Sequence, residues 1–295
     1  MKPLCIAAVV NEGYQEYIPL YLYFIFRAYP EYEVIIYFTG RLYPEVSECL
    51  DLVRGLGRFT VKPLPYVYNP SNPRMLKALR WVLCDDAFSD FNNVYIGDVD
   101  MFIVPEEVPL HEIHERHCTE IGLPYSNRVR GGQRRLTGLH FVQTAAYFPR
   151  MLPTIHKYRK LIADDAIPIG NEEILYRMME ESVGLPQIRG DFVTHHGMHA
   201  RAFTTYEDLT AQRARSDFVF TKHFEPYARS FMEACTTPIF GEIVRTLSAI
   251  SYSRETLTQY WDAGPAVRSQ IDVIQTLCRE LELERKRHGR RSPSV

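Results

Sequence analysis

The chain has 295 residues, 46% of them hydrophobic, which suffices for one large or two small globular domains with a buried core. Its formal net charge of −2 gives no electrostatic case for a nucleic-acid partner. The six cysteines include no C-x-x-C pair, so reduced core thiols are expected rather than a disulfide framework. The most apolar stretch, Tyr17–Phe26, is too short for a membrane span, and no secretory signal is visible, so a cytoplasmic location is expected.

The first hundred residues alternate strand and helix patterns. Strands are predicted at Leu4–Val10, Val34–Phe38, Phe59–Leu64 and Val94–Ile96. Helices are predicted between them at Tyr14–Tyr29, Pro44–Leu56 and Pro73–Phe88. This β-α-β-α-β-α-β series predicts an α/β fold with a mainly parallel, doubly wound sheet, whose ligands bind at the carboxyl ends of the strands.

The rest of the chain is more mixed. Strands are expected at Glu120–Pro124, His140–Phe148 and Phe192–Thr194, and helices at Arg150–Ile162, Asn171–Glu181, Tyr206–Arg215, Glu242–Ser251, Arg254–Trp261 and Pro265–Arg287. A polar, glycine-containing loop is expected at Asn127–Arg135. The domain prediction is an α/β domain over 1–205, a helical extension over 206–284 and a basic, disordered tail over 285–295.

Two carboxylates, Asp98 and Asp100, follow the fourth predicted strand, with Val99 between them. If the backbone stays extended, alternate residues share a face, so both carboxylates point to one spot. They repel each other there unless a cation lies between them. A Mn²⁺ or Mg²⁺ ion that also holds phosphate oxygens is the expected ligand. The alternative is a strand-end turn in which the aspartates bind backbone N–H groups.

The segment Asn93–Asp100 resembles the DxD region of GT-A glycosyltransferases, as does the segment before it, which contains Arg74, Lys77 and Arg80. The layout is most similar to the retaining, family-eight-like group of glycogenin and the lipopolysaccharide galactosyltransferases. Three further segments resemble that group in order, namely a strand lining the sugar pocket, an acidic helix start and a histidine segment at the metal site: Thr137–Val142, Asn171–Leu175 and His195–Gly197.

The resemblance implies a GT-A, Rossmann-like catalytic domain over 1–205. It implies a metal-dependent, retaining hexosyltransferase that moves a sugar from a nucleotide-diphosphate donor, with UDP favoured, to a glycan or lipid-linked acceptor in polysaccharide biosynthesis. The implied metal ligands are Asp98, Asp100 and His195 or His196, with His196 preferred because it directly precedes Gly197. The implied donor site comprises Val10, Asn11, Tyr14, Arg74, Lys77, Asp98, Val99, Asp100, Gly138 and His140.

Two neighbouring acids, Glu172 and Glu173, are the candidate catalytic residues. One of them would deprotonate the acceptor hydroxyl or hold the donor sugar, and Glu173 matches the family segment better. The alternative is that both only stabilise the first turn of a helix through its dipole.

Basic residues gather in three other places. Arg74, Lys77 and Arg80 share one stripe of the predicted helix and could reach a diphosphate, although a solvated face is the commoner explanation. Four arginines, Arg128, Arg130, Arg134 and Arg135, could close over a charged donor or acceptor, or could belong to a surface loop. The basic tail could contact an anionic membrane surface, or be a solvated end.

Three other functions were weighed. A sugar-nucleotide nucleotidyltransferase usually has a glycine-rich, basic signature after its first strand, which Asn11–Tyr14 matches poorly. A phosphohydrolase of the haloacid dehalogenase type has its DxD after the first strand, and none follows Val10. A non-catalytic nucleotide-sugar-binding or scaffold protein on the same fold is the third alternative, and the intact Asp98 and Asp100 argue against it.

Overall fold

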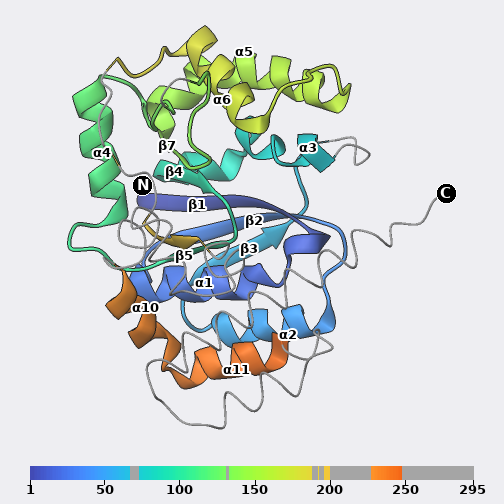
Figure 1. Cartoon of the computed structure of the whole chain (residues 1–295), viewed down its shortest axis with the longest axis vertical. Coiled ribbons are helices and arrows are strands. Elements are labelled where there is room, and N and C mark those ends of the chain that lie inside the picture. Colours follow the sequence, from blue (N-terminus) through green and yellow to red (C-terminus); the bar gives the residue numbers. More distant parts are fainter. Residues whose placement is uncertain (67–72, 131–132, 188–191, 193–195, 200–226, 248–295) are drawn as a thin grey trace, which may run out of the picture.

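A six-stranded sheet forms the centre of the protein in the computed structural model, which describes residues 1–66, 73–130, 133–187, 192, 196–199 and 227–247. The strands follow the order β3-β2-β1-β4-β7-β6 (Figure 1). Four run parallel: β1 (Lys2–Asn11), β2 (Glu33–Thr39), β3 (Arg58–Lys62) and β4 (Phe91–Gly97). Beyond β4, β7 (His140–Gln143) pairs antiparallel with β4, and β6 (Tyr125–Ser126) pairs antiparallel with β7. The predicted α/β fold and its four leading strands are confirmed.

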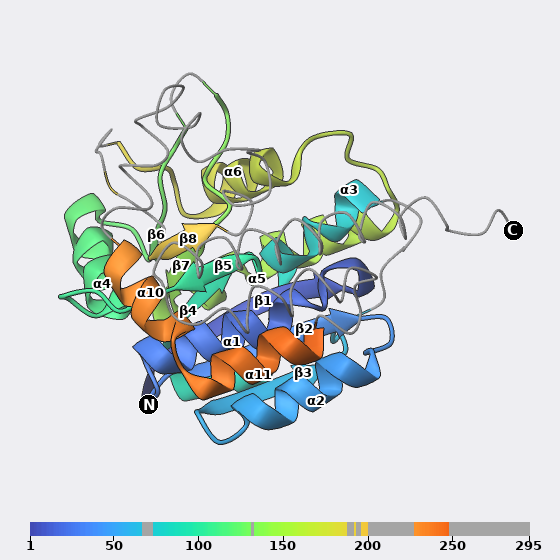
Figure 2. The same cartoon turned by 60° about the horizontal axis from the view of Figure 1, so that its bottom comes forward.

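Helices cover both faces of the sheet (Figures 1 and 2). One face carries α1 (Tyr17–Ala28) and α2 (Pro44–Val53), and the other carries α5 (Thr144–Ala163) and α6 (Asn171–Ser182). Because side chains alternate along a strand, β1 sends Leu4 and Ile6 to the α1 face and Cys5 and Ala7 to the α5 face. All four are fully buried, which explains why this strand reads as a continuous apolar run.

Two helices from late in the chain share the core with α1. They are α10 (Ala228–Cys235) and α11 (Pro238–Leu247), and they pack at the side of α1 and α2 that faces away from the sheet (Figure 1). The rings of Phe24 and Phe231 stack with centroids 5.2 Å apart. The hydroxyl of Tyr23 donates to the carbonyl of Ala234 at 2.5 Å. This part of the predicted extension is therefore helical and belongs to the same core as the α/β domain.

The helix predicted at Glu242–Ser251 begins earlier, at Pro238, and its described part ends at Leu247. The other predicted parts of the extension lie outside the described residues: the helices Tyr206–Arg215, Arg254–Trp261 and Pro265–Arg287, and the basic tail. The boundary at 205 also falls there and stays a prediction.

The single helix predicted at Pro73–Phe88 is wrong. The chain forms three short pieces instead: α3 (Pro73–Leu76) and the 3₁₀ turns η2 (Leu79–Val82) and η3 (Asp86–Asp90). The backbone of Leu83 is extended, and the side chain of Asp85 accepts a hydrogen bond from the N–H of Ala87. Asp85 thus starts a new turn, as aspartate does when its side chain competes for backbone N–H groups.

Two predicted strands also need correction. Glu120–Pro124 contains the end of α4 (Leu110–Ile121), which Gly122 closes in a left-handed conformation, φ 65°. His140–Phe148 is a strand only to Gln143, since α5 begins at Thr144 and includes the helix predicted at Arg150–Ile162. The helix predicted at Asn171–Glu181 is confirmed as α6, whereas Phe192 lies outside any strand and 193–195 outside the described residues. No helix in the described ranges combines the length and apolar character of a membrane span.

Candidate functional site

Asp98 follows β4 at the point where the sheet changes direction. From β1 the strand order runs to β2 and β3 on one side and to β4 on the other. Open α/β sheets bind ligands beyond the carboxyl ends of the strands at such a switch point. The 3₁₀ turn η1 (Glu12–Tyr14) follows β1 at the same edge. The residues after β1 and β4 therefore border one region.

Gly138 lies beside Asp98 because β7 pairs antiparallel with β4. Ile96 is opposite His140 in this pairing, and two further residues of the same register place Gly138 opposite Asp98. A Cβ atom at Gly138 would lie 3.1 Å from Oδ2 of Asp98. A Cβ here would crowd the carboxylate, so glycine allows neighbouring side chains to approach the backbone closely.

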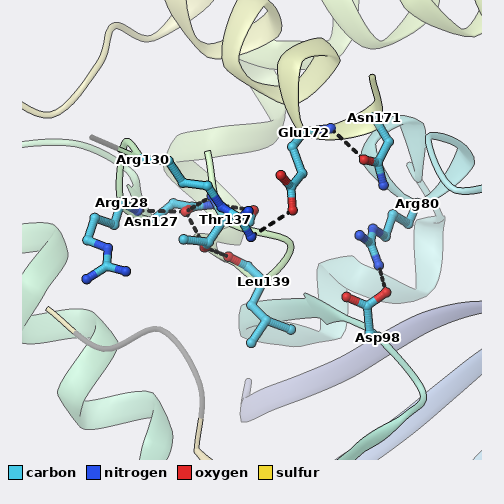
Figure 3. A network of polar contacts seen from close by, with 9 residues as sticks. All are labelled: Arg80, Asp98, Asn127, Arg128, Arg130, Thr137, Leu139, Asn171 and Glu172. Atoms are coloured by element: carbon cyan, nitrogen blue, oxygen red, sulfur yellow. Dashed lines mark hydrogen bonds and ion pairs between the residues drawn. The ribbon is translucent and has the colours of Figure 1, made fainter. Parts of the chain in front are cut away.

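Arg80 supplies a buried positive charge beside Asp98. It lies in η2, is 7% exposed, and forms an ion pair with Oδ1 of Asp98 (Figure 3). Its guanidinium also lies over the ring of Trp81, 4.3 Å from the centroid. Its Nη2 would be 3.3 Å from a Cβ at Gly138. Arg80 is thus fixed from two sides with one end directed at Gly138.

Glu172 completes the group from the first turn of α6. Its Oε1 would be 3.6 Å from a Cβ at Gly138 and lies 3.0 Å from Nη2 of Arg130. Its own N–H donates to Oδ1 of Asn171 at 2.8 Å (Figure 3). Asp98, Arg80 and Glu172 therefore converge on Gly138, with Arg130 on the outer side of Glu172.

The neighbouring acid, Glu173, is used differently. Its Oε1 lies 2.8 Å from Nη2 of Arg177, one turn along the same helix. The geometry therefore brings Glu172 to Asp98, although the sequence pattern favoured Glu173.

Asp98 and Asp100 are connected by a turn and do not lie on one extended strand. The chain leaves β4 at Gly97 and turns at Val99 and Asp100 into β5 (Met101–Ile103), so strand alternation does not align the two carboxylates. Val99 is buried.

The two carboxylates still act on one group, the hydroxyl of Tyr21. Burial raises the pKa of Tyr21 above its usual value, and the charges of Asp98 and Asp100 raise it further. The residue is fully buried, and its hydroxyl has no hydrogen-bond partner among the described residues.

The histidine half of the predicted metal site is arranged otherwise. His196 precedes β8 (Gly197–His199) and is 2% exposed. Its Nδ1 lies 2.8 Å from Oε1 of Glu106, and its Nε2 lies 2.9 Å from Nε2 of His114. A metal could bind His196 only if one of these contacts were lost. His195 lies outside the described residues.

The donor set for a cation is consequently carboxylate-rich. Within the described ranges, no three His, Cys, Asp or Glu side chains form a group that could hold a metal ion. Asp98 and Asp100 remain as two carboxylates in the short connection between β4 and β5. Two carboxylates suit Mg²⁺ or Mn²⁺ when phosphate and water supply the other ligands, so these residues fit a cation that arrives with a phosphorylated substrate.

The end of β1 offers a hydrogen-bond acceptor, the side-chain oxygen of Asn11. Oδ1 of Asn11 is buried and has no hydrogen-bond partner in the part of the chain that the structure describes. Val10 is buried beneath it, and Tyr14 is half-buried with its ring 6.2 Å from that of Tyr17. Asn11, through its unpaired buried oxygen, and the half-buried Tyr14 thus remain candidates for a ligand at this edge.

His140, predicted in the donor site, is a core residue. It is 1% exposed, with Nδ1 3.2 Å from the amide nitrogen of Asn127 and Nε2 3.2 Å from the hydroxyl of Tyr147. Burial lowers the pKa of His140 to about 3, so the ring is neutral at physiological pH.

The stripe of Arg74, Lys77 and Arg80 does not exist, because the helix that would carry it is broken. Lys77 is exposed between the pieces, and the side chain of Arg74 lies outside the description. Sequence reasoning undervalued Arg80, although a signal was present. Arg80 lies within the apolar run Leu79–Leu83, and an arginine buried among apolar residues needs an acidic partner.

Neither the protein-family models nor the curated proteins give a match. Solved structures with a similar fold include the glycosyltransferase GlyE of Streptococcus pneumoniae TIGR4, at 10% identity and a TM-score of 0.47, covering 85% of this chain and 64% of that one. S. aureus TarS 1-349 has 12% identity and a TM-score of 0.39, covering 97% and 92%. The galactosyltransferase LgtC, in complex with donor and acceptor sugar analogs, has 13% identity and a TM-score of 0.33, covering 58% and 69%. The chain thus spans about two thirds of GlyE, and similarity at this level assigns no activity.

Proposed function

We propose that the protein is a glycosyltransferase that moves a sugar from a nucleotide-diphosphate donor, with UDP favoured, to a glycan or lipid-linked acceptor. The observation that supports this most directly is the convergence of Asp98, Arg80 and Glu172 around the backbone of Gly138. The group lies at the switch point of the sheet, where α/β folds bind nucleotides.

The donor would lie between the ends of β1 and β4. The buried Oδ1 of Asn11 would accept a hydrogen bond from an N–H of the base, and the ring of Tyr14 would lie beside the base. Arg80 would donate to oxygens of the diphosphate or the sugar. Because Asp98 and Trp81 already hold the guanidinium in place, it needs little reorganisation when negative charge develops on the leaving diphosphate.

Asp98 and Asp100 would hold a Mn²⁺ or Mg²⁺ ion. Bound there, the cation would neutralise charge on the departing nucleoside diphosphate. Oδ1 of Asp98 is paired with Arg80, which leaves Oδ2, on the side of Gly138, for this ligand.

Glu172 would act at the sugar. The bond between the anomeric carbon and the diphosphate oxygen breaks, and a bond to the acceptor oxygen forms. The acceptor proton passes to Glu172 or to the departing diphosphate. Glu172 would serve as this base, or would hold the sugar hydroxyls through its carboxylate while the configuration at the anomeric carbon is retained.

A thermal-shift panel of UDP, GDP, CDP and TDP, each with and without Mn²⁺, tests the donor site. A nucleotide at 100 times its Kd should add about 2.7 kcal/mol of stability. One nucleotide should stabilise the wild type in the presence of metal and fail to stabilise Asp98→Ala. If no nucleotide raises the Tm, with or without metal, the proposal is wrong.

The second candidate is a nucleotide-sugar-binding protein without catalysis. In its favour, Asp98 and Glu172 are both neutralised by arginines in this structure. Slow hydrolysis of the donor in the presence of Mn²⁺, lost in Asp100→Ala, would identify the enzyme. Nucleotide binding without hydrolysis or transfer would identify the binding protein.

A further inference from the structure

An arm with four arginines lies beyond Glu172. It comprises residues 127–130 and 133–137 and carries Arg128, Arg130, Arg134 and Arg135. Its base is anchored by Asn127, which is fully buried. Oδ1 of Asn127 accepts hydrogen bonds from the N–H of Arg128 at 2.6 Å and from the N–H and hydroxyl of Thr137 at 3.0 and 2.6 Å (Figure 3). The base of the arm therefore has a defined conformation.

The two sides of the arm are also joined to each other and to α6. Val129 forms an antiparallel bridge with Leu136, and the N–H of Arg130 donates to the carbonyl of Arg135 at 2.8 Å. The N–H of Leu136 donates to the carbonyl of Glu172 at 3.4 Å. These bonds hold the backbone at Arg128 and Arg130 at a defined position relative to Glu172, with the side chain of Arg130 directed at Glu172 and that of Arg128 pointing away from it (Figure 3).

Among the residues that the structure describes, the arm carries more positive charge than carboxylates pair with. Arg130 is paired with Glu172, and Arg134 is paired with Glu180 at 2.6 Å. Arg128 and Arg135 have no carboxylate partner in the same part of the chain. The arm thus adds positive charge next to Glu172 in a chain whose net charge is negative.

The arm lies on the side of Glu172 away from the donor groups. Figure 3 shows Glu172 between Arg130 on one side and Arg80 with Asp98 on the other. If the donor binds at Arg80, the acceptor has the side that Arg130 borders. Arg130 is 45% exposed and its ion pair is therefore weak enough to exchange one carboxylate for another anion.

We propose that the acceptor is a glycan that carries an anionic group, a carboxylate or a phosphate, and that Arg128 and Arg130 bind this group. The inference rests on the proposed function and specifies its acceptor. The guanidinium fork matches the two oxygens of either anion. By taking Glu172's place at Arg130, the acceptor anion also frees the Glu172 carboxylate for the reaction.

Binding of three soluble trisaccharides to the full chain, saturated with the nucleotide that stabilises it, tests the proposal. The probes are trigalacturonate, a maltotriose phosphate and neutral maltotriose, measured by calorimetry. At least one acidic probe should bind at least about tenfold tighter than maltotriose, as expected for two charge-assisted contacts. The double variant Arg128→Gln/Arg130→Gln should lose that preference, and Arg128→Lys/Arg130→Lys should keep part of it.

The matched control is Arg134→Gln, which removes an arginine of the same arm that is already paired with Glu180. It should bind the acidic probe as the wild type does, and all variants should bind the nucleotide with unchanged Kd, which shows that they are folded. The identity of the tighter probe, carboxylate or phosphate, names the anion.

Equal binding of acidic and neutral probes would overturn the inference, as would an acidic preference that survives in Arg128→Gln/Arg130→Gln. Inorganic phosphate that binds as tightly as the sugar phosphate would also overturn it, because the sugar would then contribute nothing. Failure of the proposed function is a separate result, since the wild type would then bind no nucleotide at all.

Discussion

The guanidinium of Arg80 is buried and paired with the carboxylate of Asp98, and the Asp98 side chain is itself 38% exposed. Asp98 therefore has two functions in this protein. It compensates a buried positive charge, and it offers its remaining oxygen to the space at Gly138. Loss of Asp98 should consequently cost stability, and, under the proposed function, ligand binding as well.

Asp98→Ala should lower the free energy of unfolding by about 1–3 kcal/mol, because buried Arg80 loses its acidic partner. The loss is not larger because Asp98 is partly exposed, so that water weakens the ion pair. Urea unfolding of Asp98→Ala, Arg80→Ala and the double variant measures the coupling between the two residues. We expect the double variant to be less destabilised than the sum of the two single variants. Strictly additive effects would show that the ion pair contributes nothing.

Gly138→Ala should weaken nucleotide-sugar binding by at least about tenfold, because its Cβ would lie 3.1 Å from Asp98 and 3.3 Å from Arg80. The comparison is with Gly170→Ala, where a Cβ would have no neighbour within 4 Å. Equilibrium binding of the donor to both variants, at matched Tm, is the measurement. Unchanged binding in Gly138→Ala would mean that the ligand lies elsewhere.

Glu172→Gln should reduce transfer by about 10²-fold or more, as loss of a base or of a sugar-binding carboxylate does. Glu173→Gln should change transfer less than twofold and stability by only about 0.3–0.5 kcal/mol, since it breaks a single pair with Arg177 within a helix. Initial rates of both variants at saturating donor decide between the two acids. A larger loss of transfer in Glu173→Gln than in Glu172→Gln would instead favour Glu173, the acid that the sequence pattern prefers.

His196→Ala should destabilise the protein by about 2–4 kcal/mol, because Glu106 and buried His114 each lose a hydrogen bond inside the protein. The Mn²⁺-dependent part of the nucleotide thermal shift should persist, as expected if Asp98 and Asp100 hold the cation without this ring. A variant with wild-type stability but no metal-dependent shift would instead identify His196 as a ligand.

Acid should destabilise the fold through its buried histidines. The pKa of His140 is about 3 in the folded protein, against about 6.5 in the unfolded chain. Below pH 6.5 the unfolded chain therefore binds a proton that the folded protein rejects. The contribution of His140 to the free energy of unfolding should be constant above that pH and fall by up to about 1.4 kcal/mol per pH unit between pH 6.5 and 3. Burial also lowers the pKa of His114 far below its usual value, which acts in the same direction.

Chemical unfolding at pH 7, 6 and 5 measures this slope. His140→Gln should show a shallower slope than the wild type, and His156→Gln, at an exposed position of α5, should keep the wild-type slope. Parallel slopes for His140→Gln and the wild type would show that His140 is not the group that titrates.

The parallel half of the sheet was predictable because its strands are buried on both sides and therefore apolar along their whole length. The helix α4 was not predictable in the same way. Its buried positions, Leu110, His114, His117 and Cys118, have helical spacing, but two of them are histidines that hydrogen bond Ser126. A helix whose inner face is polar does not show the apolar period on which sequence reading depends.

Asp98, Gly138, Glu172 and Arg80 are all named from the sequence, and the structure brings them together, while their function stays a prediction. The contacts that join them are what no local pattern contains. Gly138 arrives through the register of β7 with β4, and Arg80 arrives because the chain forms the separate turn η2 in place of a continuous helix with a solvated stripe. The preference for Glu173 failed to anticipate Arg177, which engages that carboxylate one turn along α6.

The bond between Tyr23 and Ala234 joins positions 211 residues apart, and it has a consequence for synthesis in the cell. Chains are translated at about 5–20 residues per second, so α1 leaves the ribosome roughly 10–40 s before α10 does. During that interval the apolar side of α1 that later receives Phe231 has no cover from α10 or α11. This side of α1 in the nascent chain is therefore available to chaperones until α10 and α11 have been made.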